Sequence, residues 1–295
     1  MSRIHDALKR AEQERATSLG THVEPTVEQA EVPQIAMPSL QQNVREGPVA
    51  AAGLTYEALL THCPQAAWTP DQRTMLFFQD DETRLGTEEF RTLRSRLYQI
   101  REKMPLRRLV VTSALPKEGK SFVAANLAQV LVRQHGRRAL LIDADLRNPG
   151  MHRHLGATQT PGLTEFLLGE SDELAGLQRG PMENLFFLPA GRTATGVQEL
   201  LANGRLKLLL QRVEPLFDWI ILDSSPVILV SDSTLVATLC DGVVMVVRSN
   251  VTPTDMARRA RAEFPDKLLL GVVLNGAEKL AQSKYYYGEA VSSQV

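Results

Sequence analysis

Hydrophobic residues form short runs that alternate with amphipathic stretches from about residue 74 onward. The runs predict strands at 74–79, 107–113, 137–143, 184–189, 217–223, 241–248 and 268–274. Several are apolar at every position, which is typical of strands buried on both faces of a parallel sheet. Helical spacing between them predicts helices at about 87–102, 120–134, 197–212, 232–238 and 254–263. This alternation predicts an α/β fold, a doubly wound and mostly parallel sheet with helices on both faces.

The first seventy residues lack this alternation. A thin apolar stripe lies on one helical face near the start, formed by Ile4, Ala7, Leu8 and Ala11. It predicts a short amphipathic helix within 1–20. Pro, Gln, Glu and Val then dominate without periodicity, so we interpret 21–70 as a flexible linker and a poorly defined region. One domain is expected over 71–282, followed by a flexible tail over 283–295.

Composition narrows the class of protein. Of the 295 residues, 43% are hydrophobic and 23% are charged, as in ordinary globular proteins. A formal net charge of −1 gives no general attraction to nucleic acid or to an anionic membrane. The two cysteines, Cys63 and Cys240, lie far apart without metal-ligand spacing, which favours a reducing compartment. With no signal-peptide pattern and no apolar run of membrane-spanning length, we expect a cytoplasmic protein without direct membrane insertion.

The strongest chemical signal is a P-loop between the strand predicted at 107–113 and the next helix. The sequence Ser113-Ala-Leu-Pro-Lys-Glu-Gly-Lys-Ser121 fits a pattern with Ala or Gly first and Gly-Lys-Ser last. Backbone N–H groups of such a loop cradle phosphates, and the helix N-terminus adds its dipole. Lys120 is expected to reach the β- and γ-phosphates and Ser121 to bind Mg²⁺. The predicted nucleotide-binding residues are Ala114, Pro116, Lys117, Glu118, Gly119, Lys120, Ser121 and Phe122.

Three aspartates follow two other predicted strands. Asp143 and Asp145 come just after one buried strand, and Asp223 ends another. Ligands of open α/β sheets bind at the carboxyl ends of the strands, so the three acids are expected to converge on the phosphates. Mg²⁺ takes oxygen ligands and usually keeps several waters, so a hydroxyl with one or two carboxylates is the expected set. The predicted metal-binding residues are Ser121, Asp143 and Asp223.

These motifs resemble those of the bacterial tyrosine kinases, the ATPase partners of polysaccharide co-polymerases. The resemblance covers residues 74 to 287 and rests on the P-loop, on Asp143–Pro149 as the family's D-x-D-x-R-x-P segment, and on the acidic strand end at Leu222–Pro226. The chain departs from the family at Lys117, where Gly is usual, and at Ser225, where Pro is frequent. The resemblance implies a P-loop fold, ATP and Mg²⁺ as cofactors, and tyrosine autophosphorylation that regulates exopolysaccharide or capsule synthesis and export.

The resemblance also suggests roles for individual residues. Lys120 with Asp143 and Asp145 would form the catalytic group, Asp143 accepting the proton of the tyrosine phenol and Asp145 supporting the metal shell. Asn275, at the end of the last predicted strand, would contact adenine.

Residues 88–94 resemble the family's E-x-x-R-x-x-R oligomerisation motif. Glu88, Arg91 and Arg94 fill its charged positions, and we expect them on the solvent side of their helix, opposite an apolar face. A solvated charge stripe is the ordinary explanation for such a pattern. Within the resemblance it implies head-to-tail contacts that close a ring-like homo-oligomer.

The tail carries three of the chain's five tyrosines in one run, Tyr285, Tyr286 and Tyr287. An aromatic anchor or an edge strand is one explanation. We favour a flexible substrate tail that enters a neighbour's active site, so that the three tyrosines are the phosphoacceptors and the reaction runs in trans. The resemblance further implies that a separate membrane-spanning co-polymerase activates the kinase and recruits it to the inner face of the plasma membrane.

Two other functions remain open at this point. A Min/Par-type partition ATPase shares the fold and would position a partner without phosphorylating it. That family carries a signature lysine at the position of Leu115 here, and a C-terminal membrane helix that this sequence lacks. A small-molecule P-loop kinase would need a substrate pocket that the sequence does not reveal.

Overall fold

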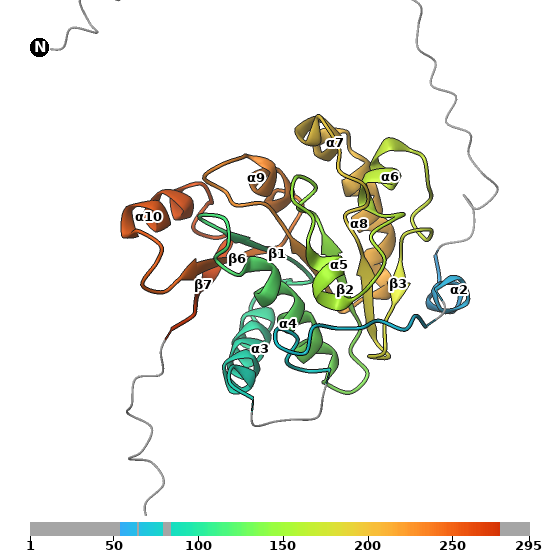
Figure 1. The fold of residues 1–295 in the computed structure, drawn as a ribbon, viewed down its shortest axis with the longest axis horizontal. Coiled ribbons are helices and arrows are strands. Elements are labelled where there is room, and N and C mark those ends of the chain that lie inside the picture. Colours follow the sequence, from blue (N-terminus) through green and yellow to red (C-terminus); the bar gives the residue numbers. More distant parts are fainter. Residues whose placement is uncertain (1–53, 64, 79–83, 278–295) are drawn as a thin grey trace, which may run out of the picture. The chain divides into compact units, whose positions relative to one another are not determined.

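A seven-stranded sheet runs through the domain in the order β3-β4-β2-β5-β1-β6-β7 (Figure 1). The computed structural model describes residues 54–63, 65–78 and 84–277. The strands are β1 Arg108–Ser113, β2 Ala139–Asp143, β3 Gln178–Arg179, β4 Leu185–Leu188, β5 Trp219–Asp223, β6 Gly242–Arg248 and β7 Leu269–Asn275. All neighbouring strands pair in parallel except β3, which is antiparallel to β4. The predicted doubly wound α/β fold is confirmed.

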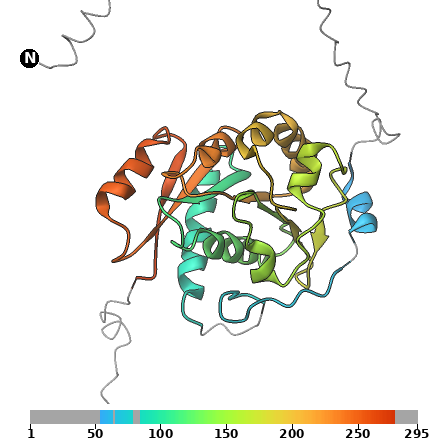
Figure 2. The ribbon, with the colours of Figure 1, turned by 45° about the horizontal axis from the view of Figure 1, so that its top comes forward.

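Helices cover both faces of this sheet (Figures 1 and 2). They are α2 Tyr56–His62, α3 Thr87–Arg101, α4 Lys120–Val132, α5 Met151–Leu155, α6 Leu163–Leu168, α7 Val197–Ala202, α8 Arg205–Val213, the 3-10 turn η1 Glu214–Leu216, α9 Asp232–Ala237 and α10 Thr254–Ala262. Alternate strand residues point to opposite faces. In β5, Trp219 and Ile221 join the core with α3, α4 and α5, while Ile220 and Leu222 join the core with α2 and α6 to α10.

The strand predicted at 74–79 is wrong for its described residues, 74–78. Met75, Leu76 and Phe77 are buried, but they lie over α4 rather than in the sheet. The Leu76 N–H donates to Asn126 Oδ1 at 2.8 Å, and the Phe77 N–H donates to Gln129 Oε1 at 3.1 Å. Side chains of α4 thus accept the backbone hydrogen bonds that a neighbouring strand would accept in a sheet. An apolar run has the same sequence pattern whether it enters a sheet or covers a helix.

Other boundaries also differ from the predictions. The helix predicted at 197–212 is two helices, because Gly204 adopts a left-handed φ of 82° between α7 and α8. Residues before the expected domain start at 71 also pack on the cores, namely those of α2 and Trp68. The short α5 and α6 and the two-residue β3 span too few residues to show a period. The predicted helix in 1–20, most of the linker, and the tail with its tyrosines lie outside the described residues.

Among the described residues, no helix has the length and apolarity required to span a membrane.

Candidate active site

The P-loop joins β1 to α4 and has unusual backbone geometry. Gly119 adopts a left-handed φ of 94°, which favours glycine, and a Cβ there would lie 2.0 Å from the Asn275 side-chain nitrogen, so that Asn275 would have to move. Lys117 also has a left-handed φ, 64°, at the position where the resembled family usually has glycine. A left-handed conformation costs a residue with a side chain about 1–2 kcal/mol. The departure noted in the sequence therefore falls at a strained position of the loop.

Lys120, the first residue of α4, sits between two aspartates. Its Nζ lies 2.7 Å from Asp145 Oδ2 and 3.8 Å from Asp223 Oδ1. Burial would lower the pKa of Lys120, but Asp223, Asp145 and Asp143 outweigh it and raise that pKa. The ammonium group is therefore held charged at the start of α4, where a P-loop lysine would meet phosphates.

Strand register brings the other acids together. Asp143 at the end of β2 is the direct cross-strand neighbour of Asp223 at the end of β5, and Asp223 is also paired with Val111 of β1. The three predicted acids and the P-loop thus share the carboxyl edge of the sheet, as the sequence indicated.

Asp143 is fully buried and caps the next helix. One carboxylate oxygen accepts the N–H groups of Gly150 and Met151 at 3.2 and 3.1 Å, and the other accepts the Asp145 N–H at 3.2 Å. Burial raises the pKa of Asp143 to about 7, and the Asp223 charge adds to the rise. The carboxylate therefore has both a structural role at the start of α5 and a basicity suited to proton transfer near neutral pH.

One oxygen of Asp223, the buried Oδ1, makes no hydrogen bond, although the Lys120 ammonium lies 3.8 Å from it. Burial raises the pKa of Asp223 to about 6, while Lys120 and a hydrogen bond from Ser121 oppose the rise. A carboxylate oxygen without a hydrogen bond, on a residue that is bonded to the Ser121 hydroxyl, fits a divalent cation, which would also relieve the repulsion between Asp223 and Asp143.

This donor set matches magnesium rather than a fully enclosed metal site. Among the described residues, no group of three or more His, Cys, Asp or Glu side chains is arranged to hold a metal ion. Mg²⁺ is commonly bound through one or two carboxylates together with substrate phosphates and waters. Ser121 and Asp223 are therefore the residues that would hold it, and the third predicted ligand, Asp143, stays a prediction.

Two contacts of the site were not foreseen in the sequence. Ser225 Oγ donates to Asp145 Oδ1 at 2.9 Å, so the departure from the family's Pro supplies a hydrogen bond that orients Asp145. Arg147 makes a two-pronged contact with the buried Asp232 of α9, at 2.6 and 3.1 Å. Arg147 was visible in its motif, whereas nothing in the sequence pointed to Asp232 as its partner.

Two predicted nucleotide-binding residues are engaged with the loop itself. The Asn275 side-chain N–H donates to the Glu118 carbonyl at 2.9 Å. The Glu118 carboxylate accepts the Leu115 N–H at 2.8 Å. A contact between Asn275 and adenine stays a prediction.

The charged motif on α3 is only partly on the solvent side. Glu88 is exposed and pairs with the half-buried Arg91. Arg94 was expected on the same face, and this is wrong: its guanidinium donates to the Val130 carbonyl of α4 at 3.1 Å. Arg94 lies four residues after the buried Phe90, and i and i+4 share a helix face.

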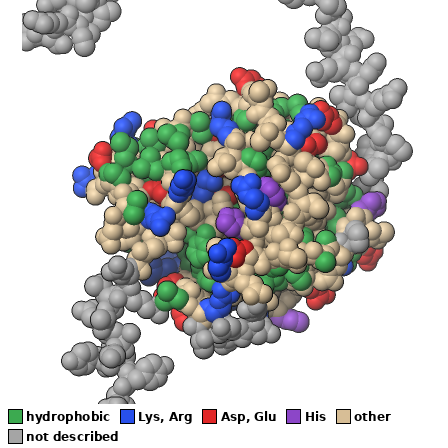
Figure 3. All heavy atoms as spheres, in the orientation of Figure 1, with side chains coloured by type: hydrophobic (Ala, Val, Ile, Leu, Met, Phe, Trp, Pro, Cys, Tyr) green, Lys and Arg blue, Asp and Glu red, His purple; other side chains and the backbone are tan. Residues whose placement is uncertain are grey.

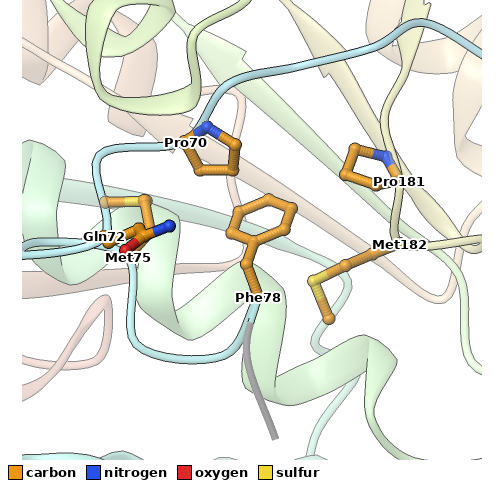
Figure 4. Close-up of a pocket in the computed structure, with 6 residues that line it drawn as sticks. All are labelled: Pro70, Gln72, Met75, Phe78, Pro181 and Met182. Carbon is orange, nitrogen blue, oxygen red and sulfur yellow. The ribbon is translucent and has the colours of Figure 1, made fainter.

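The space-filling view shows basic and histidine side chains gathered near the middle of one face (Figure 3). The three aspartates contribute little to any surface, since each is at most 3% exposed. A pocket of ≈250 Å³ lies elsewhere, lined by Pro70, Gln72, Met75, Phe78, Pro181 and Met182 (Figure 4). It is smaller than most small-molecule sites, about 300–1,000 Å³, and includes none of the predicted site residues.

Comparison with known proteins identifies the family. The tyrosine-protein kinase YwqD of Bacillus subtilis is 33% identical over 220 residues, which span 74% of this chain and 92% of YwqD. The chain belongs to the bacterial tyrosine kinases. Membership in this kinase family implies ATP as the nucleotide. No family model matches the chain.

Two further similarities support the membership. The kinase domain of the Escherichia coli tyrosine kinase ETK superposes with a TM-score of 0.63 and 28% identity, covering 71% of this chain and 83% of that domain. The succinoglycan biosynthesis transport protein ExoP of Rhizobium meliloti is 33% identical over 221 residues, 73% of this chain but 28% of ExoP. The kinase therefore resembles one part of a longer protein in that case.

The raised carboxyl pKa values predict how the stability of the kinase depends on pH. Asp143 and Asp223 bind protons more tightly in the folded chain, at about 7 and about 6, than an unfolded aspartate at about 3.9. Their stabilising contribution is thus fully present below about pH 4 and is lost as pH rises through about 6 to 7. Asp223→Asn should remove much of this loss, so that the variant gains thermal stability over the native kinase as pH rises.

Thermal unfolding midpoints without nucleotide or Mg²⁺, measured from about pH 5 to about pH 8, check this. The control is Asp255→Asn, a change at an exposed carboxylate in the first turn of α10. A native-minus-variant difference for Asp223→Asn that stays constant with pH would contradict the assignment.

Proposed function

We propose that this kinase transfers the γ-phosphoryl group of Mg-ATP to Tyr285, Tyr286 and Tyr287 of a neighbouring copy. The observation that carries the proposal is Lys120 between Asp145 and Asp223, at 2.7 and 3.8 Å, at the carboxyl edge of the sheet. That arrangement puts a fixed positive charge and buried acids where a P-loop binds phosphates. The tyrosines lie outside the described residues and are proposed from the sequence.

Phosphoryl transfer depends on positioning and on neutralising charge. Lys120 exchanges its contact with Asp145 for oxygens of the β- and γ-phosphates, and amides of the P-loop bind the same groups. Ser121 and Asp223 would hold Mg²⁺, with Asp143 and Asp145 nearby, and the ion would neutralise phosphate charge.

Asp143 orients the tyrosine phenol and takes its proton. The phenol oxygen then bonds to the γ-phosphorus while the bond from that phosphorus to the β-γ bridging oxygen breaks, so that ADP leaves. A phenol has an ordinary pKa of about 10, so its proton moves late in the reaction. The pKa of Asp143, about 7, leaves the group mostly able to accept a proton at slightly alkaline pH.

The process served by the reaction is proposed from relatives. ExoP is named for succinoglycan biosynthesis and transport, and the kinase spans 28% of it. We assign this chain to the regulation of exopolysaccharide or capsule synthesis and export, on the cytoplasmic side of the membrane. We also propose a separate membrane-spanning co-polymerase as the partner that activates and recruits the kinase.

The tail is tested by labelling. Purified native kinase with Mg-ATP should gain phosphate on its last residues, read by mass spectrometry, and Lys120→Met should gain none because the phosphate-binding charge is lost. Changing all three tyrosines to Phe should remove most phosphotyrosine and leave ATP affinity as it was. Mixing this triple variant with the Lys120→Met chain should label the tail of the latter, since transfer runs between copies.

The same experiment separates the competing function. A Min/Par-type switch would bind ATP and leave the tail unlabelled. A loss of thermal stability in the triple Phe variant would instead show that the rings are structural, and absence of label on the Lys120→Met tail would exclude transfer between copies.

Assembly is proposed to use the exposed part of the α3 motif. Glu88 and Arg91 form an ion pair at the surface, with 73% and 31% of their side chains exposed, and a neighbouring copy could exchange partners with them in a ring-like homo-oligomer.

Arg91→Ala should shift the kinase toward monomer in sedimentation velocity. Arg96→Ala, an exposed arginine of the same helix, is the control and should sediment as the native kinase does. Equal sedimentation of the Arg91 and Arg96 variants would contradict the contact.

The activator is tested by addition. The isolated kinase should label its tail slowly, and the cytoplasmic tail peptide of the proposed co-polymerase partner should raise the rate several-fold by preorganising the nucleotide site. A scrambled peptide of the same composition should have no effect. Full activity without the peptide, with no binding of it, would argue against a two-component system.

A further inference from the structure

Glu118 stands inside the P-loop, yet its side chain is turned to the protein. It is 3% exposed, and Oε2 accepts the Leu115 N–H at 2.8 Å, which ties the two halves of the loop together. Oε1 accepts the hydroxyl of Thr252, which follows β6. Both carboxylate oxygens are thus occupied by protein groups, so the residue serves the shape of the loop.

The turn after β6 is itself built around Thr252. The Thr252 hydroxyl accepts the Arg248 N–H at 3.0 Å, and the Thr252 N–H donates to the Arg248 carbonyl at 3.0 Å. One hydroxyl therefore connects the end of β6 to the carboxylate of Glu118. Loss of this hydroxyl would leave a buried carboxylate oxygen without a donor.

Two more groups hold the outer side of the loop. The Arg248 guanidinium donates to the Lys117 carbonyl at 3.1 Å, and the Asn275 amide donates to the Glu118 carbonyl at 2.9 Å. Arg248 and Asn275 are paired neighbours at the ends of β6 and β7, and the Ser249 N–H donates to the Asn275 carbonyl at 2.9 Å. The last residues of β6 and β7 thus each donate a hydrogen bond to one of two successive carbonyls of the P-loop.

Gripping those carbonyls fixes the direction of the amides that follow them. In a planar trans peptide the C=O and the next N–H point to opposite sides. With the Lys117 and Glu118 carbonyls held toward β6 and β7, the N–H groups of Glu118 and Gly119 point away from those strands. Successive N–H groups aimed to one side form an anion-binding nest.

We propose that Arg248, Thr252 and Asn275 form with Glu118 a clamp that aims the loop amides at the nucleotide phosphates. These are positioning residues for phosphate binding, and the inference rests on the proposed binding of Mg-ATP. The clamp also explains the left-handed Lys117, because strained backbone persists where the surrounding contacts over-determine it. Without the clamp, the loop would relax and bind phosphates more weakly.

The test removes one hydroxyl at constant shape. Thr252→Val should raise the Kd for ATP about tenfold, the effect of one unmade hydrogen bond to a buried group. Thr252→Ser keeps the hydroxyl and should regain most of the affinity. Thr254→Val makes the same change at an exposed position two residues on and should match the native kinase. The KM for ATP should rise about tenfold for Thr252→Val, with kcat at saturating ATP close to native.

A role in folding alone gives a different result. It would lower the thermal midpoint without nucleotide and reduce kcat through loss of active protein, leaving KM as it was, and that pattern would overturn the clamp. Equal Kd values for the Val and Ser variants of Thr252 would overturn it too.

A double-mutant cycle tests whether the clamp acts as a unit. Asn275→Ala and Thr252→Val should each raise the Kd for ATP. The double variant should raise it by less than the product of the two single fold-changes, because either substitution alone already relaxes the loop. Full multiplicativity would overturn a concerted clamp. Tail labelling is recorded in parallel: native kinase that binds ATP without labelling its tail refutes the autokinase proposal, while the affinity data still decide on the clamp.

Discussion

The active site is built around one half-buried ammonium that lies among three buried carboxylates. Lys120 contacts Asp145 and lies near Asp223, and Asp143 adds a third negative charge within the same strand ends. Burial is the main reason why the pKa values of Asp143 and Asp223 are raised to about 7 and about 6, and neighbouring carboxylates add to the rise. Such a cluster is favourable only with protons or a divalent cation present. A divalent cation bound beside Asp223 would offset part of this negative charge, which supports the proposed Mg²⁺ site.

The order of the strands determines which groups lie on each side of the P-loop. β1 leads into the loop, with β5 and then β2 on one side and β6 and then β7 on the other. The acids come from β5 and β2, and the groups that hold the loop carbonyls come from β6 and β7. The acidic side chains and the groups that hold the loop backbone thus come from opposite sides of β1. A parallel sheet allows this because the carboxyl ends of its strands share one edge.

The sequence predicted the part of the site that depends on local pattern. The P-loop and the three acids were found because each follows a buried strand, and parallel pairing then brings strand ends together. Side-chain partners distant in sequence were not found: Thr252 lies 134 residues from Glu118, and no period or motif connects them. Arg94 shows a different failure. Its motif indicated a surface role, but the helical repeat places it beside Phe90 and against α4. The run 74–78 failed because burial alone does not distinguish a strand from a cover over α4.

The contact between Arg94 and α4 connects the proposed assembly surface on α3 to the helix that follows the P-loop. Arg94 bonds to the Val130 carbonyl of α4, and Phe90 packs edge-to-face on Phe122 of the same helix with ring centres 5.7 Å apart. Because α4 begins with Lys120 and Ser121, the helix that carries Glu88 and Arg91 is packed directly on the helix that carries the phosphate-binding groups. A neighbouring copy that draws on Glu88 and Arg91 would act on α3, and close-packed interiors transmit such displacements. Under the proposed assembly, the motif would therefore divide into Glu88 and Arg91 at the surface and Arg94, which fixes α3 to the C-terminal part of α4.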